Sequence, residues 1–177
     1  FLRAGLPYRG NLRVLKSILG DEFLWNNIRV KGGAYGCMCG FNRSGSGYFV
    51  SYRDPHLAET LAVYDQIPAY LESFEADDKK MLGYIIGVIG DMDHPQSPFT
   101  WGETSLSAWM CGLTEEMRQK ERDSILACTD QDIRGLADHA RAVLAPNQFC
   151  VVGNAGRIEE QKGLFAEIMP LIGTTAG

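Results

Sequence analysis

A chain of 177 residues with 45% hydrophobic side chains is long enough to bury a core without the help of disulfide bonds. Its formal charge of −5, with acidic and basic residues interspersed, argues against a nucleic-acid surface, which needs clustered cations. The sequence contains no apolar run of about 18 residues that would predict a membrane span, and it does not open with a secretory signal peptide.

The cysteines and the first residues bear on compartment and completeness. Five cysteines are an odd number, and they lack the spacing of a disulfide framework, so they predict free thiols in a reducing compartment: Cys37, Cys39, Cys111, Cys128 and Cys150. The chain begins at Phe1 without an initiator methionine. We therefore expect it to be part of a longer polypeptide, with any targeting signal upstream.

The first predicted element is a helix that begins behind Asn11 and ends at Gly32 and Gly33. Glycine ends helices because it adopts the left-handed conformation without a Cβ penalty, and Arg29 suits the negative end of the helix dipole. Gly20 is a candidate for a local interruption. The apolar residues recur at three- and four-residue spacing, at Leu12, Leu15, Ile18, Leu19, Phe23, Leu24 and Ile28.

A β-hairpin is predicted next, with strands at 34–41 and 48–53 and a turn at 42–47. Asp54 and Pro55 then resemble a helix cap followed by a first-turn proline, so a helix is expected from there to about Leu71, bent at Pro68.

The remaining chain is mostly helical in prediction. Helices are expected from 77 or 78 to about 91, and at 104–111, 114–126, 129–144 and 157–168. Threonine caps are expected for the helices that begin at Thr114 and Thr129. A loop is expected at 94–98, a returning strand at 149–152 and a loose tail at 173–177. This order predicts an α+β fold in which helices cover an antiparallel sheet, in one domain over 1–177.

Histidines and cysteines make metal and thiol chemistry the first candidate functions. The segment from His56 to Thr60 begins like the zinc-binding HxxEH helix, but Thr60 stands where the second histidine is required, so a capped helix is favoured over a zinc site. Cys37 and Cys39 share one face of the first strand, and buried thiols acting as small apolar residues are favoured over a metal or redox pair.

The turn between the first helix and the hairpin is the other candidate site. Taken locally, Gly32 and Gly33 cap a helix and Tyr35 is an ordinary strand aromatic, and this reading is favoured without further context. The functional reading is that small residues leave the backbone around Tyr35 bare enough for another chain to approach closely.

Wider context comes from a resemblance to pitrilysin-type (insulinase-type) zinc metallopeptidases, most closely the presequence protease subfamily. It covers about 24–138 and is carried by four stretches, Leu24–Gly36 (LWNNIRVKGGAYG), Ser51–Pro55 (SYRDP), Ile85–Asp91 (IIGVIGD) and Leu113–Glu116 (LTEE). The resemblance implies the α/β sandwich of the pitrilysin and mitochondrial-processing-peptidase type. It also implies an enzyme of two similar halves, in which the N-terminal half binds zinc through an HxxEH helix and a downstream glutamate that this chain lacks.

The resemblance further implies that this C-terminal half provides substrate-binding groups, Arg29, Gly32, Gly33 and Tyr35, to a composite site. Tyr35 would stabilise the developing oxyanion, and Arg29 would hold a substrate carbonyl or carboxylate. The expected partners are the N-terminal half of the same polypeptide and short, unstructured peptides, and the fragment alone is expected to be inactive. Localisation would be cytoplasmic in a bacterium and organellar in a eukaryote. The alternatives are a non-catalytic structural or peptide-binding relative, and a thiol or metal module at Cys37 and Cys39.

Overall fold

The computed structural model describes residues 1–170, so the predicted tail at 173–177 lies outside the described residues. Helices and one small antiparallel sheet make up the described part, which agrees with the α+β prediction. In chain order the elements are η1 (Leu2–Ala4), α1 (Asn11–Ile18), η2 (Leu19–Lys31), β1 (Gly36–Phe41), β2 (Gly47–Tyr52), α2 (Ala58–Asp65), α3 (Ile67–Glu72), α4 (Asp78–Met92), α5 (Pro98–Met110), α6 (Glu115–Leu126), α7 (Asp130–Arg134), α8 (Ala137–Leu144), α9 (Ala155–Glu160) and η3 (Lys162–Leu164).

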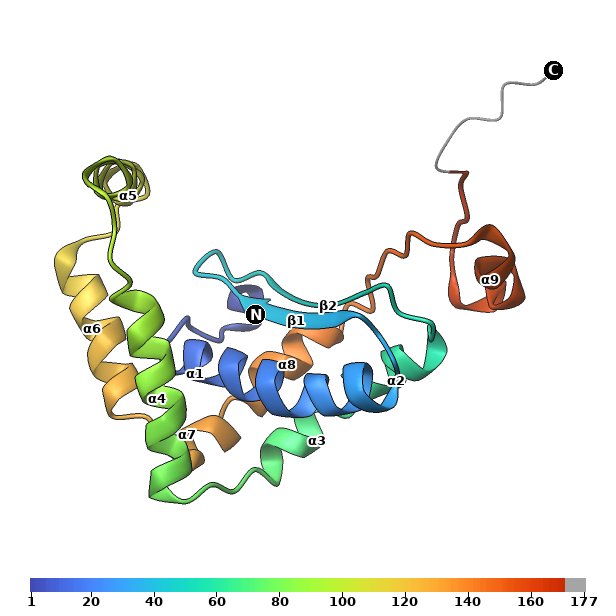
Figure 1. Ribbon diagram of the computed structural model, residues 1–177, viewed down its shortest axis with the longest axis horizontal. Helices are drawn as coiled ribbons and strands as arrows, with labels where there is room; N and C mark the ends of the chain where they lie inside the picture. Colours follow the sequence, from blue (N-terminus) through green and yellow to red (C-terminus); the bar gives the residue numbers. More distant parts are fainter. Residues whose placement is uncertain (171–177) are drawn as a thin grey trace.

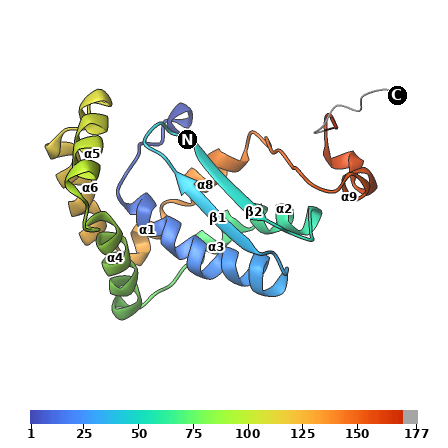
Figure 2. The same cartoon turned by 45° about the horizontal axis from the view of Figure 1, so that its top comes forward.

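The hairpin lies on one side of a layer of helices, with α1 and η2 under β1 and with α8 against β2 (Figure 1 and Figure 2). The two strands pair in the register that sets Gly36 opposite Tyr52 and Phe41 opposite Gly47. Cys39 and Phe41 are buried beneath the sheet, whereas Met38 is exposed on the outer face. The predicted hairpin is therefore confirmed, with a first strand two residues shorter than expected and a second strand of the expected length that begins one residue earlier.

The long N-terminal helix is confirmed over its predicted length. It is α-helical as far as Ile18 and continues as the π-helix η2 from Leu19, passing through Gly20 without a break. One face of the helix is almost completely buried under the hairpin, with Leu15, Ile18, Leu19, Leu24 and Ile28 at most 1% exposed. This apolar face is the centre of the core, and burial of each such side chain stabilises the fold by about 1.5–3 kcal/mol.

The segment after the hairpin differs from the prediction at its start and agrees with it at Pro68. Asp54 does not cap the helix, which begins only at Ala58, because both oxygens of its carboxylate are used elsewhere. One accepts the backbone N–H of His56 at 2.9 Å, and the other accepts the hydroxyl of buried Thr60 at 2.7 Å. Pro68 is the second residue of α3, and the helix breaks just before it because proline has no N–H to continue the ladder.

The threonine caps predicted for α6 and α7 are present, and α4 is capped as well. The side chains of Asp77 and Thr114 each accept a backbone N–H three residues on, and Thr129 forms a reciprocal capping box with Asp132. The helix predicted over 129–144 is divided into α7 and α8 at Gly135. Helix α5 is longer than predicted because Ser97 caps it and Pro98 begins it.

The structure differs from two predictions in the C-terminal segment. No strand forms at 149–152 within the described chain, because Phe149 packs against Phe165, at 5.7 Å between ring centroids, and not into the sheet. The helix predicted over 157–168 is replaced by the shorter α9, which is capped by Asn154, and by the single turn η3.

A buried carboxylate ties distant segments together next to the core. Glu121, on α6, accepts hydrogen bonds from the Tyr8 hydroxyl at 2.6 Å, from Arg13 Nε at 2.8 Å and from Arg43. Burial alone would raise the pKa of Glu121, but the bonds from Tyr8 and Arg13 and the charges of both arginines outweigh burial and lower it. Burial and Glu121 together raise the pKa of Tyr8 to about 12. The N-terminal segment, α1, the hairpin turn and α6 therefore meet at one charged group.

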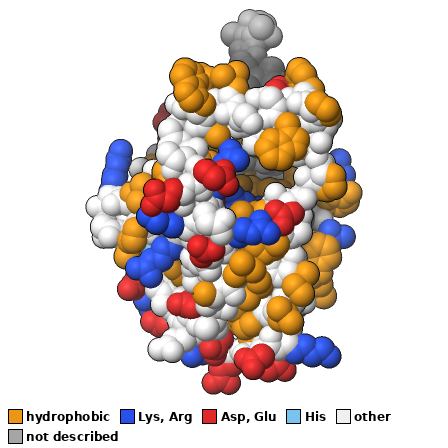
Figure 3. Space-filling view, turned by 90° about the vertical axis from the view of Figure 1, so that its left-hand side faces the viewer, with side chains coloured by type: hydrophobic (Ala, Val, Ile, Leu, Met, Phe, Trp, Pro, Cys, Tyr) orange, Lys and Arg blue, Asp and Glu red, His pale blue; other side chains and the backbone are white. Residues whose placement is uncertain are grey.

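Helix α5 projects beyond α4 and α6 at one end of the molecule (Figure 1). None of its residues is buried, and its exposed apolar side chains contribute to the hydrophobic surface seen from that end (Figure 3): Phe99, Trp101, Leu106, Trp109 and Met110. Across residues 1–170, no helix has both the length and the apolar character that crossing a bilayer requires.

Candidate functional site

The turn that carries the candidate site begins where η2 ends. Gly33 has a left-handed backbone, with a φ of 75°, and its N–H donates to the Arg29 carbonyl at 2.9 Å. The N–H of Ala34 donates to the Ile28 carbonyl at 3.1 Å, which closes the helix end. A Cβ at Gly32 would lie 2.5 Å from the same carbonyl oxygen. The predicted glycine stop is confirmed, and each glycine has its own steric reason.

Arg29 and Tyr35 lie together at this turn. Arg29 Nη1 donates a hydrogen bond of 2.8 Å to the backbone carbonyl of Tyr35. Its guanidinium carbon is 4.2 Å from the centre of the Trp25 ring, one helical turn earlier, and 5.8 Å from the centre of the Tyr35 ring. The stack on Trp25 and the bond to the carbonyl together orient the arginine head group.

Tyr35 is anchored through its backbone and open at its side chain. Its N–H points at two carbonyls, that of Tyr52 at the end of β2, at 3.1 Å, and that of Arg53 directly after the strand, at 3.3 Å. Its ring meets the ring of Tyr52 edge-on at 5.7 Å and is 62% exposed. Among residues 1–170, no group forms a hydrogen bond to the Tyr35 hydroxyl. The phenol is therefore held at its base and free to donate at its tip.

Three further side chains around Tyr35 were not identified from the sequence, namely Trp25, Tyr52 and Arg53. The guanidinium carbon of Arg53 is 5.5 Å from the Tyr35 ring centre and 5.3 Å from the Tyr52 ring centre. For Tyr52 and Arg53 the signal in the sequence was the hairpin, because the end of the second strand returns to the beginning of the first. For Trp25 it was the helical spacing, because Trp25 lies four residues before Arg29 on η2. We call Trp25, Arg29, Tyr35, Tyr52 and Arg53 the aromatic–arginine cluster.

The cluster is a cationic spot on an acidic chain. Neither Arg29 nor Arg53 forms an ion pair with any carboxylate that the structure describes, whereas Arg13, Arg43, Arg122, Arg134 and Arg141 all do. Two unpaired guanidinium groups beside an exposed phenol can hold carbonyl or carboxylate oxygens of a bound ligand.

The neighbouring cysteines behave differently from each other. Cys39 is buried, and burial raises the pKa of its thiol to about 12, which agrees with the reading of a small apolar residue. Cys37 is half-buried, and burial raises the pKa of its thiol while the charge of Arg29 opposes the rise. All five cysteines are free thiols.

Residues that could hold a metal do not gather in the described chain. Over residues 1–170 no group of three or more His, Cys, Asp or Glu side chains is arranged to bind an ion. His56 lies in the loop before α2, and its Nδ1 is 4.0 Å from a carboxylate oxygen of Glu59. His139 is buried, with Nε2 3.0 Å from the Pro7 carbonyl oxygen.

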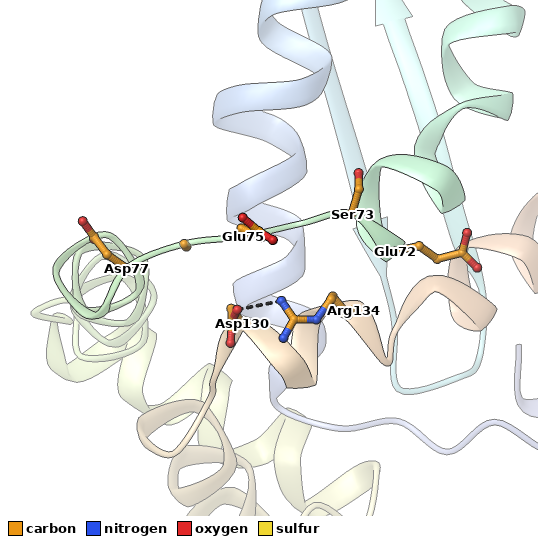
Figure 4. Close-up of a pocket in the computed structure, with 7 residues that line it drawn as sticks. Glu72, Ser73, Glu75, Asp77, Asp130 and Arg134 are labelled. Carbon is orange, nitrogen blue, oxygen red and sulfur yellow. Dashed lines mark hydrogen bonds and ion pairs between the residues drawn. The ribbon is translucent and has the colours of Figure 1, made fainter.

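Two cavities can be compared with the candidate site, and one of them includes a residue of the aromatic–arginine cluster. One, of about 690 Å³, runs along β2 between the strand, the start of α2 and the segment 147–153, and Arg53 is part of its wall. The other, of about 560 Å³, lies between the loop before α4 and helix α7, where Glu72, Glu75 and Asp77 border it (Figure 4). Among the described residues that line this second cavity, Arg134 is the one cationic side chain, and it forms an ion pair of 2.6 Å with Asp130. It is therefore already paired.

A family model and several known proteins match most of this chain. The family model described as the PreP C-terminal domain matches residues 2–155. Protein HypA of Clostridium perfringens is 44% identical over 95% of this chain and 17% of its own length. Presequence protease 1, chloroplastic/mitochondrial, of Arabidopsis thaliana is 37% identical over 75% of this chain and 12% of its own length.

The mitochondrial presequence protease of Xenopus tropicalis is 30% identical over 72% of this chain and 12% of its own length. The chain thus spans less than a fifth of the length of these relatives. Because the family match includes the helix, the turn and the hairpin that build the aromatic–arginine cluster, this chain belongs to the presequence protease family and corresponds to its C-terminal domain.

Proposed function

We propose that this domain supplies substrate-binding and transition-state groups to the composite active site of a peptidase that degrades short, unstructured peptides. The observation that carries the proposal is the juxtaposition of an unpaired Arg29 with an exposed, anchored Tyr35 at one turn. The names of the relatives in Arabidopsis and Xenopus, presequence proteases, support a proteolytic parent.

Tyr35 is assigned the role of oxyanion donor. Negative charge develops on the carbonyl oxygen as a peptide bond is attacked, and a donor that meets this oxygen stabilises the transition state more than the ground state. The hydroxyl of Tyr35 is suited to this because its backbone is fixed by two carbonyls while its tip remains available. Loss of one such donor lowers turnover by roughly a hundredfold or more.

Arg29 and the two glycines are assigned to substrate binding. One of the five N–H donors of Arg29 bonds the Tyr35 carbonyl, which leaves donors for a substrate carbonyl or carboxylate. Gly32 and Gly33 leave the backbone of the turn without side chains, so an extended peptide can approach it closely. Binding and charge stabilisation would then occur within one short segment.

Residues 1–170 contain no group of side chains that fits a zinc site, so the proposed roles of this domain involve no metal bound to it. We assign the zinc and the group that activates the nucleophile to the N-terminal half of the same polypeptide, which is the domain's expected partner. Residues 1–177 would form one domain of the pitrilysin-type sandwich, and its substrates would be peptides and not nucleic acids or membranes. The compartment would be cytoplasmic in a bacterium and organellar in a eukaryote.

The test is steady-state kinetics of the full-length zinc-loaded protein on an internally quenched, unstructured peptide. Tyr35→Phe removes only the hydroxyl, and we expect kcat to fall by roughly a hundredfold with KM changed by less than about threefold. Tyr48→Phe is the matched control, because Tyr48 is also an exposed tyrosine of the same hairpin, at 46% exposure. Full turnover in Tyr35→Phe would refute the role. Peptide binding without turnover in the unaltered protein would favour a non-catalytic, peptide-binding relative.

A further inference from the structure

Arg53 has a backbone conformation that a residue with a side chain rarely adopts. Its φ is 48°, and Asn147 is the other non-glycine residue with a positive φ in the described chain. Asparagine tolerates this left-handed region well, whereas arginine has no such preference. Strain of this kind persists only where surrounding contacts enforce it, and it is frequent at functional sites.

Contacts on both sides enforce the conformation of Arg53. On one side, its carbonyl accepts the N–H of Tyr35 at 3.3 Å. On the other side, the carboxylate of Asp54 bonds the backbone of His56 and the hydroxyl of buried Thr60, which fixes the loop that follows. The backbone of Arg53 is therefore coupled directly to the backbone of Tyr35.

The side chain of Arg53 is directed at the same residue. Its guanidinium carbon is 5.5 Å from the Tyr35 ring centre, within the range of a cation–π contact, and 5.3 Å from the ring centre of Tyr52. The guanidinium forms no ion pair with a carboxylate within residues 1–170. Its contacts with the two aromatic rings are therefore the interactions that orient it. Together with Arg29, at 5.8 Å, it gives the Tyr35 ring two cationic contacts.

The geometry points to Arg53 as a positioning residue that holds the ring, and thereby the hydroxyl, of Tyr35 in its working orientation. The inference rests on the proposed function of Tyr35 and adds a member to that site from the far end of the hairpin. A misplacement of a catalytic group by a fraction of an ångström to 1 Å is enough to lower turnover markedly. Substrate contact by Arg53 itself is not required for this role.

The experiment uses the full-length zinc-loaded protein and an internally quenched peptide without charged side chains, so that ion pairs between the guanidinium and substrate side chains do not contribute. Arg53→Gly removes the side chain and also relieves the backbone strain. We expect an equal or higher melting temperature together with a kcat that is about 3- to 10-fold lower and a KM within about twofold. If Arg53 only stabilised the fold, a variant with an equal or higher melting temperature would keep its full kcat.

Three further variants complete the test. Asn147→Gly is the matched control, because it changes to glycine a left-handed residue that is not a member of the cluster, and its kcat should stay unchanged. Arg53→Met keeps the aliphatic stem without the charge and should repeat the loss of turnover, whereas Arg53→Lys should restore at least half of it because the cation is retained. Full kcat in Arg53→Met overturns the inference, whatever the stability of Arg53→Gly.

A double variant separates the failure of this inference from the failure of the proposed function. If Arg53 acts through the Tyr35 hydroxyl, Arg53→Met should lower kcat by less than about 1.5-fold in a Tyr35→Phe background. An undiminished loss in that background would make Arg53 an independent substrate contact and overturn the positioning role. Normal kcat in Tyr35→Phe alone would instead refute the proposed function, whereas a slow Tyr35→Phe with a fully active Arg53→Met would refute only the inference drawn here.

Discussion

Replacing Glu121, the buried carboxylate on α6, by glutamine should destabilise the domain. The side chain of Glu121 is only 6% exposed, and it accepts hydrogen bonds from Tyr8, Arg13 and Arg43, which come from three different segments. Glutamine is nearly isosteric, but it removes the negative charge and turns an NH₂ group toward donors.

The magnitude follows from burial of the pair. Breaking a fully buried ion pair costs about 3–5 kcal/mol, because one charge is left without a partner. Here Arg13 and Arg43 are 46% and 33% exposed, so water can solvate part of the guanidinium groups once the carboxylate is gone. We therefore expect a loss of about 2–3 kcal/mol in the free energy of unfolding at pH 7.

Urea unfolding followed by far-UV circular dichroism measures this loss as a lower midpoint, by about 1–1.5 M for an m-value near 2 kcal/mol/M. The dependence on pH gives a second readout. The pKa of Glu121 in the folded state lies below its ordinary value of 4.5, so its contribution is complete above pH 4.5 and is lost as the pH falls through the folded-state pKa. The difference between the two proteins should therefore shrink in acid.

Asp93→Asn is the matched control, because Asp93 also pairs with an arginine, Arg122 of α6, but on the exposed surface. Its midpoint should not change measurably. Equal midpoints for Glu121→Gln and the unaltered chain at pH 7, or a difference that stays constant below pH 4.5, would refute the reasoning.

Two other predictions concern the helix end and the thiols. Gly33→Ala should lower the free energy of unfolding by about 1 kcal/mol in the same urea assay, because alanine is strained at a φ of 75° even though the added carbon meets nothing closer than 3.8 Å; an unchanged midpoint would contradict this. In the native chain at pH 8, Ellman's reagent should react promptly with exposed Cys111 and Cys150 but not with buried Cys39 and Cys128, where burial raises the pKa of each thiol to about 12. Protection of all four until urea is added, or rapid reaction of all four, would contradict the second.

The sequence predicted well those parts of the fold that depend on neighbours along the chain. The apolar period of the N-terminal helix, its stop at Gly32 and Gly33, and the cap at Thr129 are all local signals, and each is present. The same local reading was wrong at Asp54, whose carboxylate bonds Thr60 and so cannot cap the helix as expected.

Errors elsewhere arose from contacts between residues that are distant in sequence. The run at 149–152 has strand composition, but its apolar residue Phe149 finds a partner in Phe165 and not in the sheet. Arg29 and Tyr35 were identified because a single turn joins them. Arg53 depends on the register of the hairpin, and the turn was predicted to end one residue later than it does, so the neighbour of Tyr35 across the strands could not be assigned.

The aromatic–arginine cluster is built almost entirely from side chains outside the hydrophobic core. Trp25, Tyr35 and Tyr52 are each between 41% and 62% exposed. The buried residues of η2, such as Leu24, belong to the core instead. Natural variation could therefore remove the cluster and leave folding intact, because no cavity would open beneath it. Under the proposed roles of Arg29 and Tyr35, a homologue with the same fold but without these side chains would fold and not hydrolyse peptides.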